Sequence, residues 1–96
     1  MKHQITKGKR IWLPCEVRGG PFPDERIVYV KSKLGEWFGF VNVKELKDKT
    51  PSGKDYVRGV VLGVSSDHIV VAIEGQSPTT SNSLQADPSF IEHGAF

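Results

Sequence analysis

The residues able to do chemistry are few in this sequence and lie far apart. It has three histidines and one cysteine. His3, His68 and His93 show no spacing, such as His-x-His, that would bring two imidazoles to one metal ion. Cys15 has no second cysteine with which to form a disulfide or a zinc site, and no histidine is near it in the sequence. The sequence therefore predicts no metal site and no cofactor.

Carboxylates and glycines give no stronger catalytic signal. Asp24 and Glu25 are adjacent, but neighbours in an extended chain point apart, and Arg26 offers them a partner. The glycines match neither of the common phosphate-binding loop motifs. An enzyme would need a polar cluster from distant segments, for example Cys15 with His68 or Asp67. We keep an enzyme as the third alternative and assign no catalytic residue.

Aromatic residues on the expected outer faces of strands are the strongest candidates for function. Trp12 and Tyr29 have the outward parity in their segments, Phe22 lies between two prolines, and either Trp37 or Phe38 must face outward. The candidate binding residues are Trp12, Phe22, Arg26, Tyr29 and Trp37. The alternative is that these rings pack under loops or under the tail, as isolated apolar residues often do.

Exposed aromatic rings beside basic side chains suit two kinds of partner. Aromatic anchors with an arginine rim are typical of protein and peptide contacts, whereas rings beside cations also stack on single-stranded nucleic acid. The net charge is only +2, and acids are interleaved with the basic residues. We therefore expect a non-enzymatic binding module for a protein or peptide partner. Weak RNA or single-stranded DNA binding by a basic barrel face is the second choice, and the oligomeric state stays open.

Composition places the chain among small soluble globular proteins. Its 96 residues are 38% hydrophobic and 25% charged, which fits one domain with a modest core. The N-terminus lacks the apolar stretch of a signal peptide, and the longest apolar run, residues 69–73, is too short to span a membrane. We expect a cytoplasmic protein with no membrane contact.

Apolar residues alternate with polar ones in five segments, and no segment has the period of a longer helix. The expected strands are residues 10–18, 26–32, 37–42, 56–64 and 68–74. Pro14 cannot donate a ladder hydrogen bond, so the first strand should lie at a sheet edge or carry a bulge. Residues 43–46 are expected to form a single helical turn.

One segment carries a family resemblance. Residues 35–46, Gly-Glu-Trp-Phe-Gly-Phe-Val-Asn-Val-Lys-Glu-Leu, resemble the end of an SH3 domain, where a strand leads into a helical turn and a closing apolar residue. The matching positions are Gly39, Phe40, Val41 and Leu46. The resemblance implies an SH3-like barrel with its distal turn at residues 33–36. Asn42 and Glu45 stand where the peptide-binding members have a proline and a groove tyrosine, so binding of proline-rich peptides is not implied.

We therefore expect an all-β fold, either a small five-stranded SH3-like barrel or a curled antiparallel sheet, with a disordered C-terminal tail. The expected parts are a flexible N-terminus at residues 1–8, the barrel domain at residues 9–75 and a polar, disordered tail at residues 76–96. Leu84 is the only strongly apolar residue between 76 and 85. Phe90, Ile91 and Phe96 are unusual in such a tail. They either pack back on the body or form a docking motif, and a frayed terminus is the simplest prediction.

Overall fold

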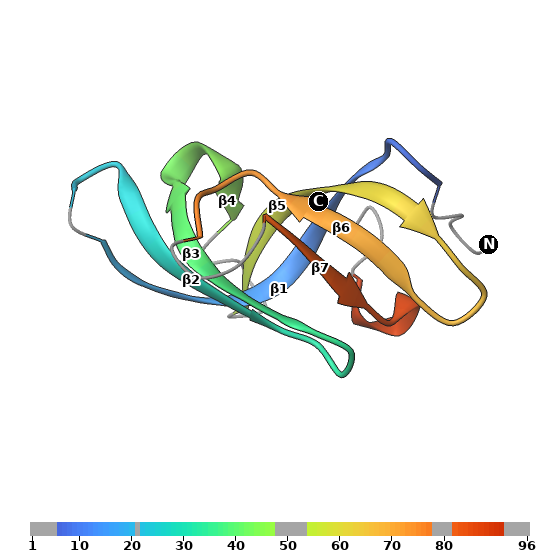
Figure 1. The fold of residues 1–96 in the computed structure, drawn as a ribbon. Coiled ribbons are helices and arrows are strands. Elements are labelled where there is room, and N and C mark those ends of the chain that lie inside the picture. The colour runs from blue at the N-terminus through green and yellow to red at the C-terminus, as the bar shows by residue number, and fades with distance from the viewer. Residues whose placement is uncertain (1–5, 21, 48–53, 78–81, 92–96) are drawn as a thin grey trace.

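The computed structural model describes residues 6–20, 22–47, 54–77 and 82–91. Within these ranges the regular elements are antiparallel strands and two short 3-10 turns (Figure 1). The elements are β1 (Arg10–Gly19), β2 (Glu25–Lys31), β3 (Glu36–Asn42), η1 (Val43–Glu45), β4 (Leu46–Lys47), β5 (Asp55–Val64), β6 (Ile69–Ile73), β7 (Ser83–Ala86) and η2 (Pro88–Phe90). The predicted all-β fold is confirmed. None of the described helical turns has the length and apolar character needed to cross a membrane.

Alternation of side chains builds the core. In β2, Val28 and Val30 are buried and Tyr29 between them is exposed. Full burial of a side chain of this size stabilises the fold by about 1.5–3 kcal/mol, which fixes which face of each strand points inward. The buried cluster consists of Ile11, Leu13, Val28, Val30, Trp37, Val41, Val57, Val61, Ile69, Val71, Ile73, Leu84, Ala86 and Ile91.

The strands follow the order β3-β2-β1-β5-β6-β7, and β4 pairs with β5. Two parts of the sheet share β1: its residues 10–15 pair with β5, and its residues 16–19 pair with β2. The expectation that this strand lies at a sheet edge is therefore wrong for the strand as a whole. Pro14 lies in the half of β1 that pairs with β5. Proline has no backbone N–H for a second neighbouring strand, and this half of β1 has the local character of a sheet edge, so Pro14 is tolerated there.

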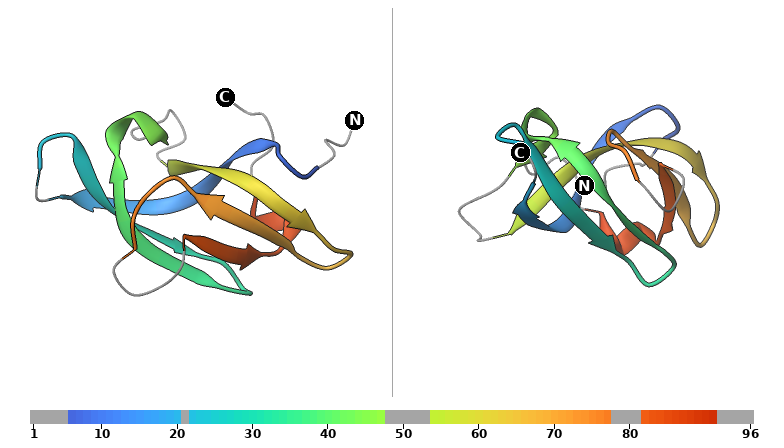
Figure 2. Two further views of the ribbon diagram at one scale, coloured as in Figure 1. Left: turned by 45° about the horizontal axis from the view of Figure 1, so that its top comes forward. Right: turned by 60° about the vertical axis from the view of Figure 1, so that its left-hand side comes forward.

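The sheet curls until β3 meets the chain that follows β6, which gives a nearly closed barrel (Figure 2). Phe40 and Gln76 exchange two backbone hydrogen bonds, of 2.8 and 2.9 Å. Two glycines permit this close approach. A Cβ on Gly39 would lie 2.4 Å from the carbonyl oxygen of Gln76, and a Cβ on Gly75 would lie 2.6 Å from that of Phe40. Any side chain at either position would force the two segments apart.

The described part of the predicted tail differs from the expectation. β7 pairs with β6 and lies between β6 and the β2–β3 hairpin (Figures 1 and 2). Leu84, Ala86 and Ile91 are buried in the common core. The compact body thus continues through Ile91, beyond the boundary expected at residue 75. Residues 78–81 and 92–96, with Phe96, lie outside the described residues.

The start of the body and the predicted helical turn are also defined. Gly8 donates a backbone hydrogen bond of 2.7 Å to Val61, so this end of the expected flexible N-terminus is attached to β5, while residues 1–5 lie outside the described part. The turn expected at residues 43–46 is present as η1. Asn42 caps it, since its Oδ1 accepts a hydrogen bond of 2.9 Å from the Lys44 amide.

Candidate functional site

Four apolar side chains cover the outward face of the β2–β3 hairpin, in the cross-strand pairs Tyr29–Phe38 and Ile27–Phe40. The rings of Tyr29 and Phe38 are stacked with their centroids 4.9 Å apart, and those of Phe38 and Phe40 are tilted at 6.5 Å. Tyr29 is 40% exposed, while the other three side chains are partly exposed. We call Ile27, Tyr29, Phe38 and Phe40 the aromatic face.

Exposed charges of both signs border the aromatic face. Glu16 and Arg18 lie beside it on β1, in register with β2, and Lys31 and Glu36 form the next cross-strand pair toward the hairpin turn. All four side chains are exposed. Their formal charges cancel, so the rim presents a mixed and neutral pattern. A polar rim of mixed charge is typical of protein–protein interfaces. Binding of a nucleic-acid backbone instead relies on clustered lysines and arginines that neutralise its phosphates.

A groove opens beside the aromatic face, near the point where β1 leaves β2 to pair with β5. Its volume is about 740 Å³, within the range of roughly 300–1,000 Å³ that is usual for ligand sites. The apolar lining consists of Pro14, Cys15, Val30, Trp37, Phe38 and Phe90. Tyr29 and Phe38 belong to both the groove and the aromatic face, so the two form one continuous surface.

Trp37 lies in the core, contrary to the expectation that it contributes to an exposed surface. It is 2% exposed, and the edge of its ring lies over Gly39 and Gly75. Because β3 turns Trp37 and Val41 inward, Phe38 takes the outward position. The Trp37 Nε1 is buried, and it has no hydrogen-bond partner among the residues that the structure describes. A buried donor left unpaired costs about 1–3 kcal/mol.

Trp12 contacts cations of its own sheet. The Lys47 Nζ lies 5.0 Å from the Trp12 ring centroid, and the Arg58 Cζ lies 5.1 Å from it. Arg58 is the cross-strand neighbour of Trp12 and also lies 3.7 Å from the Glu45 carboxylate. This cluster is on the half of β1 that pairs with β5, whereas Tyr29 is on the hairpin that pairs with the other half. Trp12 is therefore not part of the aromatic face.

Phe22 lies in the loop between β1 and β2, and Arg26 is the second residue of β2. Phe22 is 61% exposed. The Arg26 guanidinium donates hydrogen bonds of 2.9 Å to the Pro23 carbonyl and 2.8 Å to the Glu25 carbonyl, so it holds the loop in place. Arg26 has the opposite parity to Tyr29 in β2 and does not border its ring. Among the residues predicted for binding, Tyr29 is the one that the structure places on the aromatic face.

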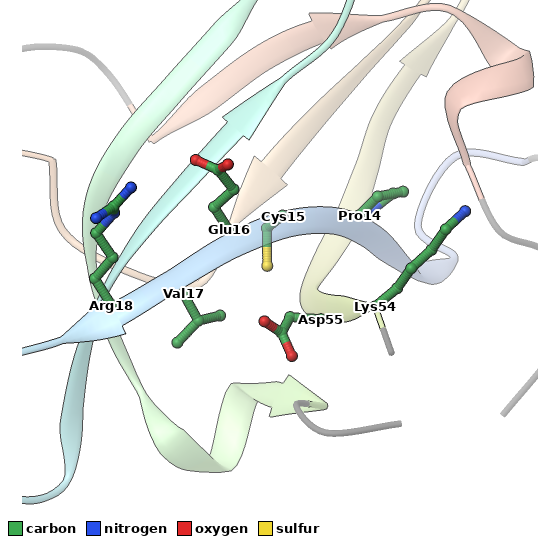
Figure 3. Close-up of a pocket in the computed structure, with 7 residues that line it drawn as sticks. All are labelled: Pro14, Cys15, Glu16, Val17, Arg18, Lys54 and Asp55. Carbon is green, nitrogen blue, oxygen red and sulfur yellow. The ribbon is translucent and has the colours of Figure 1, made fainter. Parts of the chain in front are cut away.

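A second hollow, of about 450 Å³, lies along β1 around Cys15 (Figure 3). The Cys15 side chain points to the side of β1 on which Asp55, its cross-strand partner, lies. Burial, with a smaller contribution from the Asp55 charge, raises the pKa of the thiol to about 12. A thiol that keeps its proton is a poor nucleophile and a poor metal ligand.

The combination of Cys15 with His68 is not assembled by the fold. Cys15 pairs with Asp55, the first residue of β5, whereas His68 lies in the turn beyond Val64, the last residue of that strand. The length of the strand, roughly 30 Å of extended chain, separates them. His68 instead contacts its neighbour Asp67, at 2.8 Å, and this hydrogen bond lowers the pKa of the Asp67 carboxyl. In the described ranges no three His, Cys, Asp or Glu residues gather at a possible metal site.

Comparison with known proteins identifies no relative of this chain: no protein-family model, curated protein or solved structure matches it.

Proposed function

We propose that the protein is a non-enzymatic binding module that contacts a protein or peptide partner through the aromatic face. The observation that carries this proposal is the stacked, partly exposed pair Tyr29–Phe38 on the outer side of a hairpin whose inner side already supplies the core. The outward face of an antiparallel strand pair in water ordinarily carries polar residues. Aromatic rings supply large contact areas at low cost in side-chain entropy and are the usual anchors of protein contacts.

The charges around the face support a protein partner. Glu16 and Glu36 alternate with Arg18 and Lys31 around the rings. Mixed rim charges select partners and fix their register, and they contribute little to affinity by themselves. The apolar groove next to the rings offers a recess for one side chain of the partner.

We also propose an SH3-like architecture for the barrel. The strand β3, the η1 turn and the short strand β4 that contains Leu46 follow one another as the resemblance of residues 35–46 implies, and β1 and β2 precede them in an antiparallel meander. Asn42 and Glu45, which replace the proline and the tyrosine of the peptide-binding members, are engaged with Lys44 and Arg58. The proposed contact surface is accordingly the outer side of the hairpin and not the groove for proline-rich peptides.

Binding of single-stranded nucleic acid is the second candidate function. One observation favours it: the stacked rings lie on the second and third strands of a small, nearly closed barrel. Five-stranded Greek-key barrels bind oligonucleotides on the corresponding face, and bases stack on aromatic rings regardless of sequence. Glu16 and Glu36 place negative charge where the phosphates would run, which ranks this function second.

Replacement of the stacked pair tests the proposal. Tyr29→Ser with Phe38→Ser removes the stacked pair from the aromatic face. Leu62→Ser with Val64→Ser is the matched control, since Leu62 and Val64 are exposed apolar residues of β5. Each protein is immobilised and incubated with extract from the organism's cells, with and without nuclease. Circular dichroism and thermal unfolding confirm that both variants are folded.

We expect wild type and the β5 control to retain the same nuclease-resistant protein, and the hairpin variant to lose about tenfold or more of it, the usual effect of removing an interface anchor. Equal retention by all three proteins would overturn the proposal. Retention that disappears after nuclease treatment and weakens steeply with salt would replace it with the second candidate.

A further inference from the structure

We propose that the groove beside the aromatic face binds a partner segment that carries an apolar side chain next to a lysine or arginine. This inference rests on the proposed function and specifies the partner's chemistry. It follows from the apolar lining of the groove and from the charges at its mouth.

The lining of the groove is apolar and comes from three parts of the fold. β1 contributes Cys15, the hairpin contributes Val30 and Trp37, and η2 contributes Phe90. Cys15 and Phe90 are only partly buried and pack against the core cluster, so they leave apolar surface at the groove. A partner side chain that enters gains about 25 cal/mol for each Å² of apolar surface removed from water. The volume of about 740 Å³ accommodates one such side chain together with part of its backbone.

The charges at the mouth favour a cationic neighbour for that side chain. Glu16, Lys31 and Glu36 border the groove, which gives the mouth a formal charge of −1. Neither carboxylate has an ion pair within the described part of the chain. A lysine or arginine of the partner would supply a counterion. Two exposed ion pairs of ordinary strength together change affinity by about three- to tenfold.

Trp37 lies between the groove and the core. The residue lines the groove, and its side chain is otherwise buried. Because the chemical shift of an indole N–H responds to changes in the packing around the ring, the indole resonance of Trp37 reports on occupancy of the groove.

Two short peptides test this inference on the full chain. The probe is acetyl-Ala-Lys-Phe-Lys-Ala-amide, and the matched peptide is acetyl-Ala-Glu-Phe-Glu-Ala-amide. Each is titrated into ¹⁵N-labelled protein while the amides of Lys31 and Glu36 and the indole N–H of Trp37 are followed. Glu16→Gln with Glu36→Gln removes the charge at the mouth. Asp24→Asn with Glu74→Gln removes two other exposed carboxylates as a control.

We expect the lysine peptide to shift these three resonances and to bind about tenfold more tightly than the glutamate peptide. The Glu16 and Glu36 variant should weaken it by about three- to tenfold, and the control should leave it unchanged. Equal binding of both peptides, or an unmoved Trp37 indole, would overturn the inference. If the natural partner is lost by the Tyr29 and Phe38 variant but retained in full by the Glu16 and Glu36 variant, the proposed function stands and this inference fails.

Discussion

Gly39→Ala should open the barrel at its closure. An added Cβ would lie 2.4 Å from the Gln76 carbonyl oxygen and 2.6 Å from the nearest atom of the Trp37 ring. Both distances are about 1 Å shorter than an ordinary van der Waals contact. Because one neighbour is backbone and the other a buried indole, neither can rotate away.

The structure can respond to the added methyl group in two ways. Overpacking of a filled interior costs about 1–3 kcal/mol. If β3 instead moves away from Gln76, the two hydrogen bonds between Phe40 and Gln76 weaken, each worth about 0.5–1.5 kcal/mol. Either response lowers the free energy of unfolding by about 1–3 kcal/mol. For a domain of this size, that lowers Tm by at least about 4 °C.

Gly63→Ala is the matched control. Gly63 follows a register shift in the β5–β6 pairing, its φ is not positive, and an added Cβ would meet no atom within 4 Å. The substitution restricts the unfolded chain, so stability should change by less than about 1 kcal/mol. Urea unfolding monitored by tryptophan fluorescence measures both variants. If Gly39→Ala unfolds at the same urea concentration as Gly63→Ala, the closure between β3 and residues 75–76 is incorrect.

Three further predictions concern the rest of the fold. Leu84→Ala should lower the free energy of unfolding by about 2–5 kcal/mol because Leu84 is buried; an unchanged urea midpoint would show that β7 is not part of the core. Cys15 should resist alkylation by iodoacetamide near neutral pH until urea unfolds the chain, since burial raises its pKa to about 12. The free energy of unfolding should also fall as the pH rises from about 9 toward 12, because the thiol of the unfolded chain ionises before that of the folded chain. Phe22→Ser should leave Tm within about 2 °C of wild type because the ring is 61% exposed; a larger decrease would mean that the loop packs on the body.

Alternation of apolar residues was sufficient to predict the five longer strands of the body and the side that β1 and β2 bury. In β2 it assigned Val28 and Val30 to the core and Tyr29 to the surface, as the structure shows. It failed for β7, where Ser-Leu-Gln-Ala offers only Leu84 and Ala86 at period two. That strand exists because β6 and the β2–β3 hairpin provide a ready apolar surface for it, which is a tertiary effect that local sequence does not encode.

The candidate site was predictable only in part. Trp37 and Phe38 are adjacent, so alternation required one ring to face outward without deciding which. The signal that could have decided it is Gly39, since an indole fits over a glycine two residues further along the same face. Two other features could not be predicted from the neighbouring sequence, because both depend on long-range strand pairing. Phe90 lies beside the hairpin in the groove, and Trp12 contacts Lys47 and Arg58 away from the aromatic face.

Photo-crosslinking from the centre of the aromatic face tests the proposed function most directly. Phe38 is replaced in cells by a photo-crosslinking phenylalanine analogue, which keeps an aromatic ring in place, and Val64 is replaced in a separate control. The aromatic face predicts one protein adduct at position 38 that survives nuclease and is absent at position 64. No adduct above the level at position 64, or an adduct that nuclease removes, would contradict it.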